Sequence, residues 1–319
     1  MLKRFNAAAP TLCFELTDRC DMSCPKCITS SHRSETGRQL TLYGIKSSLL
    51  LPYRFAGGKR LIICGGEPTL SEKLPSIIEC AISLRLNVFL ASNLYRTGRP
   101  LLRRLLELMD DRAHTFMFSY DSIIPEEMKR IRGVNAHRQV TENIHSLLEI
   151  KERLGSRTRI AASFVLHKEN AGSAAETLKF LVGLKLHKVV VQPANQYGVV
   201  DINSFSAVSP PYGKTHLPKM LKAIDTLFSL GKTFPEIQIV HPDRKRWIRH
   251  FTSPTAQKTV CKSRNFIFVD SFGNFRGCNN SKIYANLEDV GVVDFHASDF
   301  YKDHLSLTNV CNICLHSTA

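Results

Sequence analysis

Short apolar runs alternate with longer amphipathic segments along most of the chain. The apolar runs have the length and composition of buried strands and comprise residues 11–17, 60–64, 87–92, 115–120, 159–166 and 188–192. The amphipathic segments have apolar residues at helical spacing and comprise residues 40–51, 71–84, 101–109, 138–153, 174–184 and 217–230. Strands this apolar, alternating with helices, are typical of a parallel sheet covered by helices. The pattern therefore predicts an α/β fold.

The amino-acid composition of the sequence changes toward its C-terminal end. Residues 203–214 are rich in proline, glycine and serine, and after His241 come a basic run, glycines, aromatic residues and four more cysteines. We place a domain boundary within residues 235–255 and predict two domains, residues 1–240 and residues 241–319. If the first domain closes partly into a barrel, its active site lies at the carboxyl ends of the strands. Residues that directly follow a strand are therefore the main candidates for active-site residues.

The ten cysteines are unevenly distributed. Cys20, Cys24 and Cys27 directly follow the first predicted strand, and Cys311 and Cys314 form a second tight pair. Disulfide frameworks belong to small secreted domains, whereas closely spaced cysteines in a cytosolic enzyme more often bind metal. Three thiolates in one loop can each bond a different iron of a 4Fe–4S cluster and leave the fourth iron open. The first group thus predicts a cluster with a free coordination position.

The cysteine loop and a glycine-rich loop together resemble a known family. Residues 20–27 form a CxxxCxxC motif after the first strand, and Gly65-Gly66-Glu67-Pro68 follows the second strand. Both features, at this separation, resemble the radical S-adenosylmethionine (SAM) superfamily. The resemblance implies a partial (β/α)6 TIM-like barrel and a 4Fe–4S cluster whose open iron is chelated by the amino and carboxylate groups of SAM. It also implies reductive cleavage of SAM to a 5′-deoxyadenosyl radical that abstracts hydrogen from a substrate.

The resemblance assigns the SAM contacts to the strand ends. It implies that the loop at residues 65–68 holds the SAM amino group, because glycines allow a close backbone approach and a carboxylate suits an ammonium. Polar residues at the ends of later strands are further candidates for SAM contacts: Ser92, Asn93, Ser119, Asp121, Ser163 and Gln192. Each of them could instead bond its local backbone. One position departs from the family, since Lys26 stands where relatives usually carry an aromatic residue that packs against adenine.

Four cysteines beyond the predicted barrel resemble a second feature of this family. They are Cys261, Cys278, Cys311 and Cys314, with a glycine five residues before the second of them. The order resembles the twitch domain, a shortened relative of the SPASM domain, and implies one auxiliary 4Fe–4S cluster in a small cysteine-rich α+β module. Residues 266–275 predict a β-hairpin that would bring the first two of these cysteines together. A structural zinc site with four cysteine ligands fits the same spacing.

Three further cysteines, Cys13, Cys64 and Cys80, lie outside these groups. Buried free cysteine is common, so packing is the default interpretation for all three. Cys13, or alternatively His32, could supply the fourth ligand if the first cysteine loop were a zinc knuckle. Cys64 directly precedes the glycine-rich loop, where a thiol could return a hydrogen atom to a substrate radical. Cys64 is therefore our candidate catalytic residue.

The chain is strongly basic, with a formal charge of +15 from 43 basic and 28 acidic residues. Such a surplus favours anionic partners, and we expect a small-molecule substrate, with anions among the candidates, and an acidic electron donor such as flavodoxin or ferredoxin. The basic segment 244–250 contains Trp247, the one tryptophan, and could form a phosphate-binding and stacking patch. The alternative, which we favour, is a solvated helix face with one apolar side packed down. Nucleic acid is accordingly not among the partners we expect.

The residues leave the reaction open. Our leading hypothesis is oxidation of a small-molecule alcohol or sugar, with the second electron passing to the auxiliary cluster. The alternatives are maturation of a ribosomal peptide by epimerisation or cross-linking, modification of a nucleic acid, and a non-catalytic iron–sulfur scaffold. Ten residues before the first strand are too few for a leader-peptide recognition domain. Because neither a signal peptide nor a run of about 18 apolar residues is present, we expect a cytoplasmic protein without a membrane span.

Overall fold

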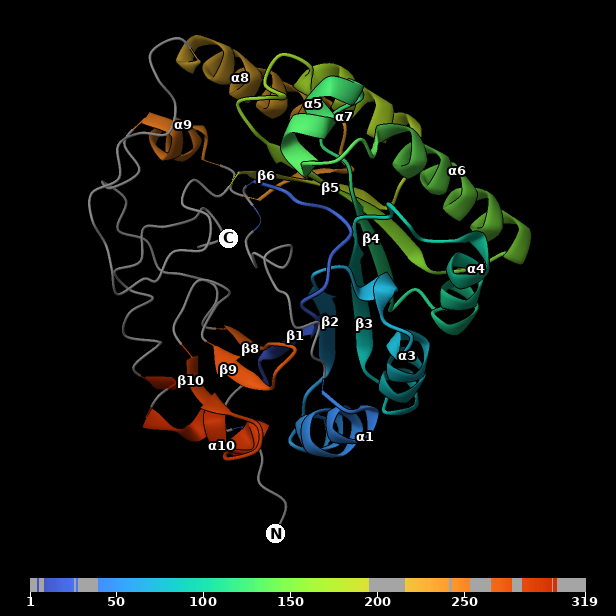
Figure 1. Cartoon of the computed structure of the whole chain (residues 1–319). Coiled ribbons are helices and arrows are strands. Elements are labelled where there is room, and N and C mark those ends of the chain that lie inside the picture. Colours follow the sequence, from blue (N-terminus) through green and yellow to red (C-terminus); the bar gives the residue numbers. More distant parts are fainter. Residues whose placement is uncertain are drawn as a thin grey trace.

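A single mixed sheet forms the centre of the molecule in the computed structural model (Figure 1). The structure describes residues 5, 9–25, 27, 40–194, 216–240, 243–252, 265–276, 283–299 and 301–302. Within these residues the sheet has ten strands in the order β10-β9-β8-β1-β2-β3-β4-β5-β6-β7. The strands from β8 to β7 pair in parallel, whereas β9 pairs antiparallel with both β8 and β10.

The strands follow the apolar runs of the sequence. Their bounds are β1 Thr11–Thr17, β2 Arg60–Gly65, β3 Asn87–Ser92, β4 Thr115–Ser119, β5 Arg159–Leu166, β6 Lys188–Pro193, β7 Ile237–Ile239, β8 Phe266–Val269, β9 Asn274–Arg276 and β10 Ile283–Asn286. All six predicted strands are present within one residue of their predicted ends. The predicted hairpin is also confirmed, because β8 and β9 pair antiparallel through Val269 and Phe275.

The helices lie along one face of the sheet, where α3, α4 and α6 form its outer cover (Figure 1). Their bounds are α1 Leu42–Gly44, η2 Ile45–Leu50, α2 Leu51–Phe55, η3 Pro68–Leu70, α3 Leu74–Ser83, α4 Arg99–Leu108, α5 Pro125–Arg132, α6 His137–Leu154, α7 Ala174–Gly183, α8 Leu217–Thr233, α9 Arg244–Thr252 and α10 Val292–Ala297. Every predicted helix is present. The elements that the pattern did not predict are η3, α5, β7, β10 and α10.

Side-chain alternation along β1 divides the sheet into two faces. Leu12, Phe14 and Leu16 belong to the main apolar core that the helices cover. The residues between them, Cys13 and Glu15, therefore point to the opposite, concave face. Because the sheet ends at β10 and β7 without joining them, it forms an open, partial barrel, as predicted.

The C-terminal segment continues the same sheet rather than forming a separate one. β8 pairs with β1 in parallel from Thr11↔Phe266 to Phe14↔Val269, while β7 pairs with β6 on the other side of the barrel strands. The division into residues 1–240 and 241–319 stays a prediction. None of the helices that the structure describes is long and apolar enough to cross a membrane.

Helix α9 contradicts one interpretation of the basic segment. Trp247 is fully buried, with its ring centroid 6.1 Å from that of Phe228 and 6.4 Å from that of Phe251. A stacking patch built on Trp247 is therefore wrong, because no face of the indole is open to a base. The alternative is confirmed: α9 packs its apolar side down and carries its basic residues outward.

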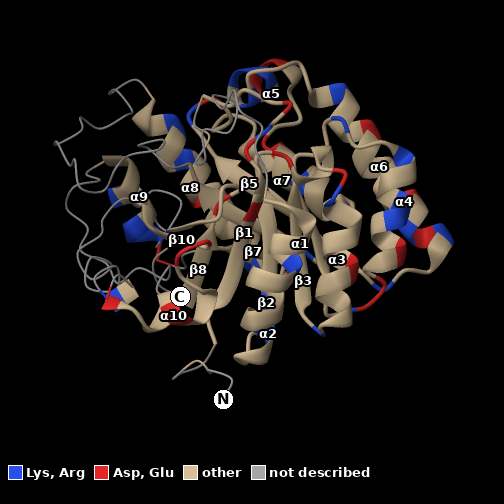
Figure 2. Ribbon diagram, turned by 60° about the horizontal axis from the view of Figure 1, so that its bottom comes forward, with Lys and Arg blue, Asp and Glu red and all other residues tan. Residues whose placement is uncertain are grey.

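Charged residues on the outer helices form exposed pairs. Figure 2 shows basic and acidic positions interspersed on α4 and α6, where Arg99 bonds Glu149 at 2.9 Å and Arg103 bonds Glu107 at 2.9 Å. Exposed pairs of this kind contribute little to stability, about 0–1 kcal/mol each. The positive surplus of the chain is thus partly offset on this surface.

Candidate active site

A cavity of about 330 Å³ opens at the carboxyl ends of the barrel strands. It is lined by Cys20, Cys24 and Cys27, and by the candidate catalytic residue Cys64. Nine of the ten predicted cofactor-binding residues also line it: Gly65, Gly66, Glu67, Ser92, Asn93, Ser119, Asp121, Ser163 and Gln192. Pro68 does not, since it is buried in η3. The sequence motifs thus meet in one place, although the role of each side chain stays a prediction.

The two glycines bring the glycine-rich loop against the cysteine loop. The Gly66 N–H donates to the Thr17 carbonyl at 2.7 Å, and the Glu67 N–H donates to the Arg19 carbonyl at 2.8 Å. Gly65 has a φ of +127°, in the region that favours glycine. A Cβ on Gly66 would lie 2.0 Å from the Arg19 carbonyl oxygen. The close approach that these glycines permit is therefore to the start of the cysteine loop.

Glu67 is almost completely buried and accepts four hydrogen bonds from the chain. Its Oε1 accepts hydrogen bonds from the Thr69 N–H at 3.1 Å, the Thr69 hydroxyl at 2.7 Å and the Ser92 hydroxyl at 2.8 Å. Its Oε2 accepts one hydrogen bond, from the Asn93 N–H at 2.6 Å. Burial raises the pKa of Glu67, while these donors act in the opposite direction. Oε2 keeps room to accept a further donor, such as a ligand ammonium.

Asn93 links the end of β3 to the cysteine loop. Its side-chain amide donates to Asp21 Oδ1 at 2.8 Å and lies 3.7 Å from the Cys20 sulfur. The other side-chain atom, Oδ1, accepts from the Tyr95 N–H at 2.7 Å, and the Ser92 hydroxyl likewise accepts from the Leu94 N–H. Ser92 and Asn93 thus make the local backbone bonds that we considered as the alternative, in addition to facing the cavity.

Arg132 is a cavity residue that the motifs did not indicate. Its guanidinium bonds Asp121 at 2.5 Å and reaches the Cys24 thiol, and its buried Nε has no hydrogen-bond partner among the described residues. The Arg132 carbonyl accepts from the Ser23 N–H at 3.1 Å, so the helix end also holds the cysteine loop. The sequence signal that could have identified Arg132 is its place directly before Gly133, the glycine that ends α5. This helix begins shortly after Asp121, a polar residue that follows β4.

The remaining predicted residues form one row across the later strands. Ser119 and Ser163 are register partners on β4 and β5, and the Gln192 amide donates to the Ser163 hydroxyl at 3.3 Å. Asp121 accepts from the Val165 N–H at 2.9 Å in addition to binding Arg132. These contacts hold polar side chains along the wall opposite the cysteine loop.

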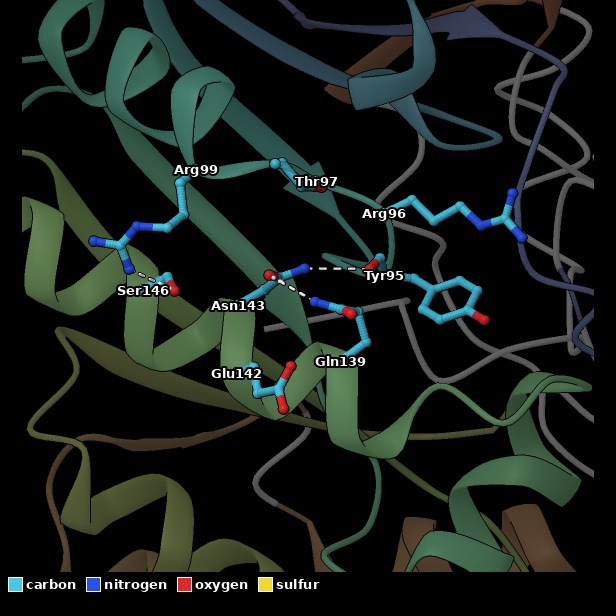
Figure 3. Close-up of a pocket in the computed structure, with 9 residues that line it drawn as sticks. Tyr95, Arg96, Thr97, Arg99, Gln139, Glu142, Asn143 and Ser146 are labelled. Carbon is cyan, nitrogen blue, oxygen red and sulfur yellow. Dashed lines mark hydrogen bonds between the residues drawn. The ribbon is translucent and has the colours of Figure 1, made fainter.

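A second hollow, of about 560 Å³, lies behind the end of β3 (Figure 3). The Asn143 amide of α6 donates there to the Leu94 and Tyr95 carbonyls, at 2.7 Å and 3.2 Å. The Thr97 hydroxyl contacts that of Thr69 at 3.1 Å, and Thr69 in turn bonds Glu67. The side chains of this hollow therefore support the loop that presents Asn93 and Glu67 to the cavity.

The Cys64 thiol lies in the cavity wall with its sulfur 3.5 Å from that of Cys13. The contact with Cys13, followed by burial, raises the pKa of Cys64 well above that of a free thiol. Cys64 is therefore a neutral thiol at physiological pH. Cys13, which we considered as a zinc ligand, contacts Cys64 instead.

The residues of the cysteine loop fit an iron–sulfur cluster. Three thiolates that each bond a different iron need to share a cavity, and Cys20, Cys24 and Cys27 all line this one, although no three such side chains among the described residues already lie close enough together to hold a metal ion. Burial raises the pKa of Cys20 to about 12 and also raises that of Cys24. These sulfurs therefore carry thiolate charge only beside a bound cation, which the irons would supply. Cys261, Cys278, Cys311, Cys314 and Lys26 lie outside the described residues, so the auxiliary cluster stays a prediction.

Comparison with known proteins finds relatives that match large parts of the chain. A GTP 3′,8-cyclase of Haemophilus ducreyi is 24% identical over 307 residues, covering 92% of this chain and 84% of that protein. A PqqA peptide cyclase of Bradyrhizobium diazoefficiens is 26% identical over 186 residues, covering 58% of this chain and 46% of that protein.

Solved structures share the fold. Streptococcus suis SuiB bound to the precursor peptide SuiA matches with a TM-score of 0.71 at 13% identity, covering 96% of this chain and 71% of that one. AnSMEcpe with bound AdoMet matches with a TM-score of 0.66 at 14% identity, covering 96% of this chain and 88% of that one. The sequence model described as "Radical SAM superfamily" matches residues 14–181, more than half of the chain. The chain belongs to the radical SAM superfamily.

Proposed function

We propose that the chain is an enzyme that abstracts a hydrogen atom from a small anionic substrate and then returns one from the Cys64 thiol, so that the substrate is rearranged rather than oxidised. When bound in the cavity, the cluster and SAM supply the hydrogen-abstracting radical. Cys20, Cys24 and Cys27 would hold the cluster. Glu67 would receive the SAM ammonium at Oε2, the atom with spare acceptor capacity.

The observation that carries this proposal is the position of Cys64. Its thiol lines the same cavity as the three cluster cysteines and Glu67. An S–H bond is weaker than most C–H bonds, so a carbon radical takes hydrogen from a thiol readily. The raised pKa of Cys64 keeps the hydrogen on the sulfur. A substrate radical formed in this cavity would therefore have a hydrogen-atom donor, the Cys64 thiol, in the cavity wall.

The relatives support a rearrangement over the oxidation of an alcohol or sugar. GTP 3′,8-cyclase and PqqA peptide cyclase are both named for ring formation. Abstraction of one hydrogen atom and return of another leaves the substrate's hydrogen count unchanged, as an intramolecular cyclisation or an epimerisation requires. Oxidation of an alcohol or sugar instead removes two hydrogen atoms. It is therefore the second candidate.

The charge of the whole chain supports an anionic substrate. Within the cavity Arg130 and Arg132 are offset by Glu67 and Asp121, but the chain carries a formal charge of +15. Such a field raises the local concentration of anions. The GTP 3′,8-cyclase relative, matched over most of its length, makes a nucleotide the first substrate to test. A peptide is the alternative, supported by the shorter match to the PqqA peptide cyclase.

Replacement of Cys64 tests the hydrogen return. The reconstituted enzyme is incubated with SAM, a reductant and GTP, and the product is identified by its mass. We expect a wild-type product with the hydrogen count of GTP, and in Cys64→Ala a product yield about tenfold lower. Cleavage of SAM in the variant should stay within about twofold of wild type. Cys80→Ala, a cysteine on α3 away from the cavity, is the matched control.

Two outcomes would count against the proposal. If Cys64→Ala yields the same product as fast as wild type, Cys64 is not the donor. If phosphorylated alcohols or sugars rather than GTP are converted to products lacking two hydrogen atoms, and Cys64→Ala converts them equally well, the oxidation hypothesis replaces the rearrangement.

A further inference from the structure

A second thiol lies directly behind Cys64. The Cys13 and Cys64 sulfurs are 3.5 Å apart, on the neighbouring strands β1 and β2. Cys13 is 6% exposed, whereas Cys64 lines the cavity. Both residues are outside the helix-covered apolar core, as their place on the concave face requires. One thiol of the pair therefore faces the cavity, and the other is shielded from it.

The sheet holds this pair as two thiols in contact. The register pairs Cys13 with Ile62, not with Cys64. The two cysteines are therefore separated by one strand and by two residues along it, which places their Cα atoms about 8 Å apart. Disulfides usually need Cα atoms about 4.4–6.8 Å apart. Exchange of a hydrogen atom between the sulfurs needs no such backbone movement.

Glu15 is next to both thiols. It lies two residues after Cys13 on the same face of β1, and its register partner on β2 is Cys64. Its carboxyl group makes no hydrogen bond or ion pair with the residues that the structure describes. The charged groups that face it are Asp270 and Arg276, which bond each other at 3.2 Å.

The surroundings of Glu15 suit it to proton exchange. Burial, followed by the charge of Asp270, raises the pKa of Glu15 to about 7, although Arg276 acts in the opposite direction. Near neutral pH a substantial fraction of Glu15 is therefore protonated, and the group can release its proton and take it back without a large change in free energy. Carboxylates at their ordinary pKa would be ionised and could not donate.

We propose that Cys13 and Glu15 restore the Cys64 thiol after it has given up its hydrogen atom, a step that rests on the proposed role of Cys64. The S–H bond of Cys13 breaks and the S–H bond of Cys64 forms, which leaves the unpaired electron on the shielded Cys13 sulfur. One electron, from the same one-electron reductant that reductive SAM cleavage consumes, and one proton from Glu15 then restore the Cys13 thiol. Glu15 regains its proton from water.

The test uses the reconstituted enzyme with SAM and dithionite in D2O, without an added substrate. In this uncoupled reaction the Cys64 thiol is the expected donor to the adenosyl fragment of SAM. The two readouts are the fraction of 5′-deoxyadenosine that carries deuterium and the amount formed per chain over time. We expect deuterium in the wild-type product and a fraction at least about fivefold lower in Cys64→Ala.

Cys13→Ala separates the relay from the donor. We expect the first equivalent of 5′-deoxyadenosine per chain to form with its deuterium, and later turnovers to slow about tenfold, because Cys64 is no longer restored. Cys80→Ala should match wild type in both phases. If the 5′-deoxyadenosine made by Cys64→Ala carries as much deuterium as that made by wild type, the proposed function fails. If Cys64→Ala loses this deuterium while Cys13→Ala follows the wild-type time course, only the proposed relay is wrong.

Glu15→Gln tests the source of the proton. Because the protonated carboxyl is the donor, the later turnovers of wild type should slow as the pH rises through about 7. In Glu15→Gln they should be slow at every pH, with the first equivalent unchanged. Glu72→Gln, an exposed carboxyl variant, should keep the wild-type pH profile. A wild-type pH profile in Glu15→Gln would exclude Glu15 from the relay.

Discussion

Replacement of Gly66 with alanine is expected to abolish cluster retention and to lower the free energy of unfolding by about 1–3 kcal/mol. The added Cβ would lie 2.0 Å from the Arg19 carbonyl oxygen and 2.5 Å from the Arg19 carbonyl carbon. Both are backbone atoms of the segment that leads into Cys20, so no side-chain rotation relieves the contact. The cysteine loop has to move, and its three sulfurs would lose their shared position. Iron content after anaerobic reconstitution and the midpoint of urea unfolding measure the two effects.

Gly172→Ala is the matched control for this substitution. A Cβ at Gly172 meets nothing within 4 Å, so we expect wild-type iron content and an unfolding midpoint close to that of wild type. An iron content in Gly66→Ala equal to that of Gly172→Ala would contradict the account, because the two loops would then not depend on each other's backbone.

Glu67→Gln is expected to weaken SAM binding by about 10- to 100-fold. The substitution removes the carboxylate charge that would pair with the SAM ammonium, and hydrogen bonds to charged groups contribute about 1.5–3 kcal/mol. It also sets an amide NH2 against donors that Glu67 now accepts, since Oε1 and Oε2 each receive a hydrogen bond from the chain. We therefore expect a loss of stability of about 1–3 kcal/mol as well.

Equilibrium binding of SAM to the reconstituted Glu67→Gln enzyme separates the loss of SAM affinity from the loss of stability. Glu72→Gln removes an exposed carboxylate from the same region, and it should leave SAM affinity and stability unchanged. Because Glu67→Gln is destabilising, affinity is measured well below its unfolding temperature, with iron content as the check on folding. If a Glu67→Gln enzyme with full iron content binds SAM with wild-type affinity, Glu67 stabilises the loop and does not bind SAM.

The sequence alone predicts most of the barrel. The apolar runs that form β1 to β6 are recognisable because one face of each strand is buried in the core, and parallel pairing brings their carboxyl ends to one edge. That rule predicts that residues as distant as Asn93 and Gln192 meet in one cavity, and they do. The prediction succeeds because strand order follows chain order from β1 to β6.

Other features depend on contacts that no local pattern reveals. Helix α5 buries a single residue, Met128, so it has no apolar stripe to predict it, and Arg132 at its end could not be placed beside Cys24. The pairing of β8 with β1 joins the two ends of the chain and is invisible to periodicity. The contact of Cys13 with Cys64 likewise depends on the register of β1 and β2, which the sequence does not specify.

The glycine-rich loop illustrates a correct prediction with an incomplete reason. The motif indicates a place where backbone approaches a ligand closely. The structure shows that the close approach at Gly66 is to Arg19 of the cysteine loop. This contact could be found only once the two loops were placed side by side, although the residue type required is the same.

The most direct test of the central claim compares wild type with a Cys20/Cys24/Cys27→Ala triple variant, using Cys80→Ala as the control. Each protein is reconstituted anaerobically, and its iron content, its reduced EPR spectrum and the 5′-deoxyadenosine formed from SAM are measured. We expect the triple variant to lose about four irons per chain, together with the matching EPR signal and all cleavage of SAM, while Cys80→Ala retains all three. A triple variant that keeps the iron content and SAM cleavage of wild type would contradict a cluster bound by these three cysteines.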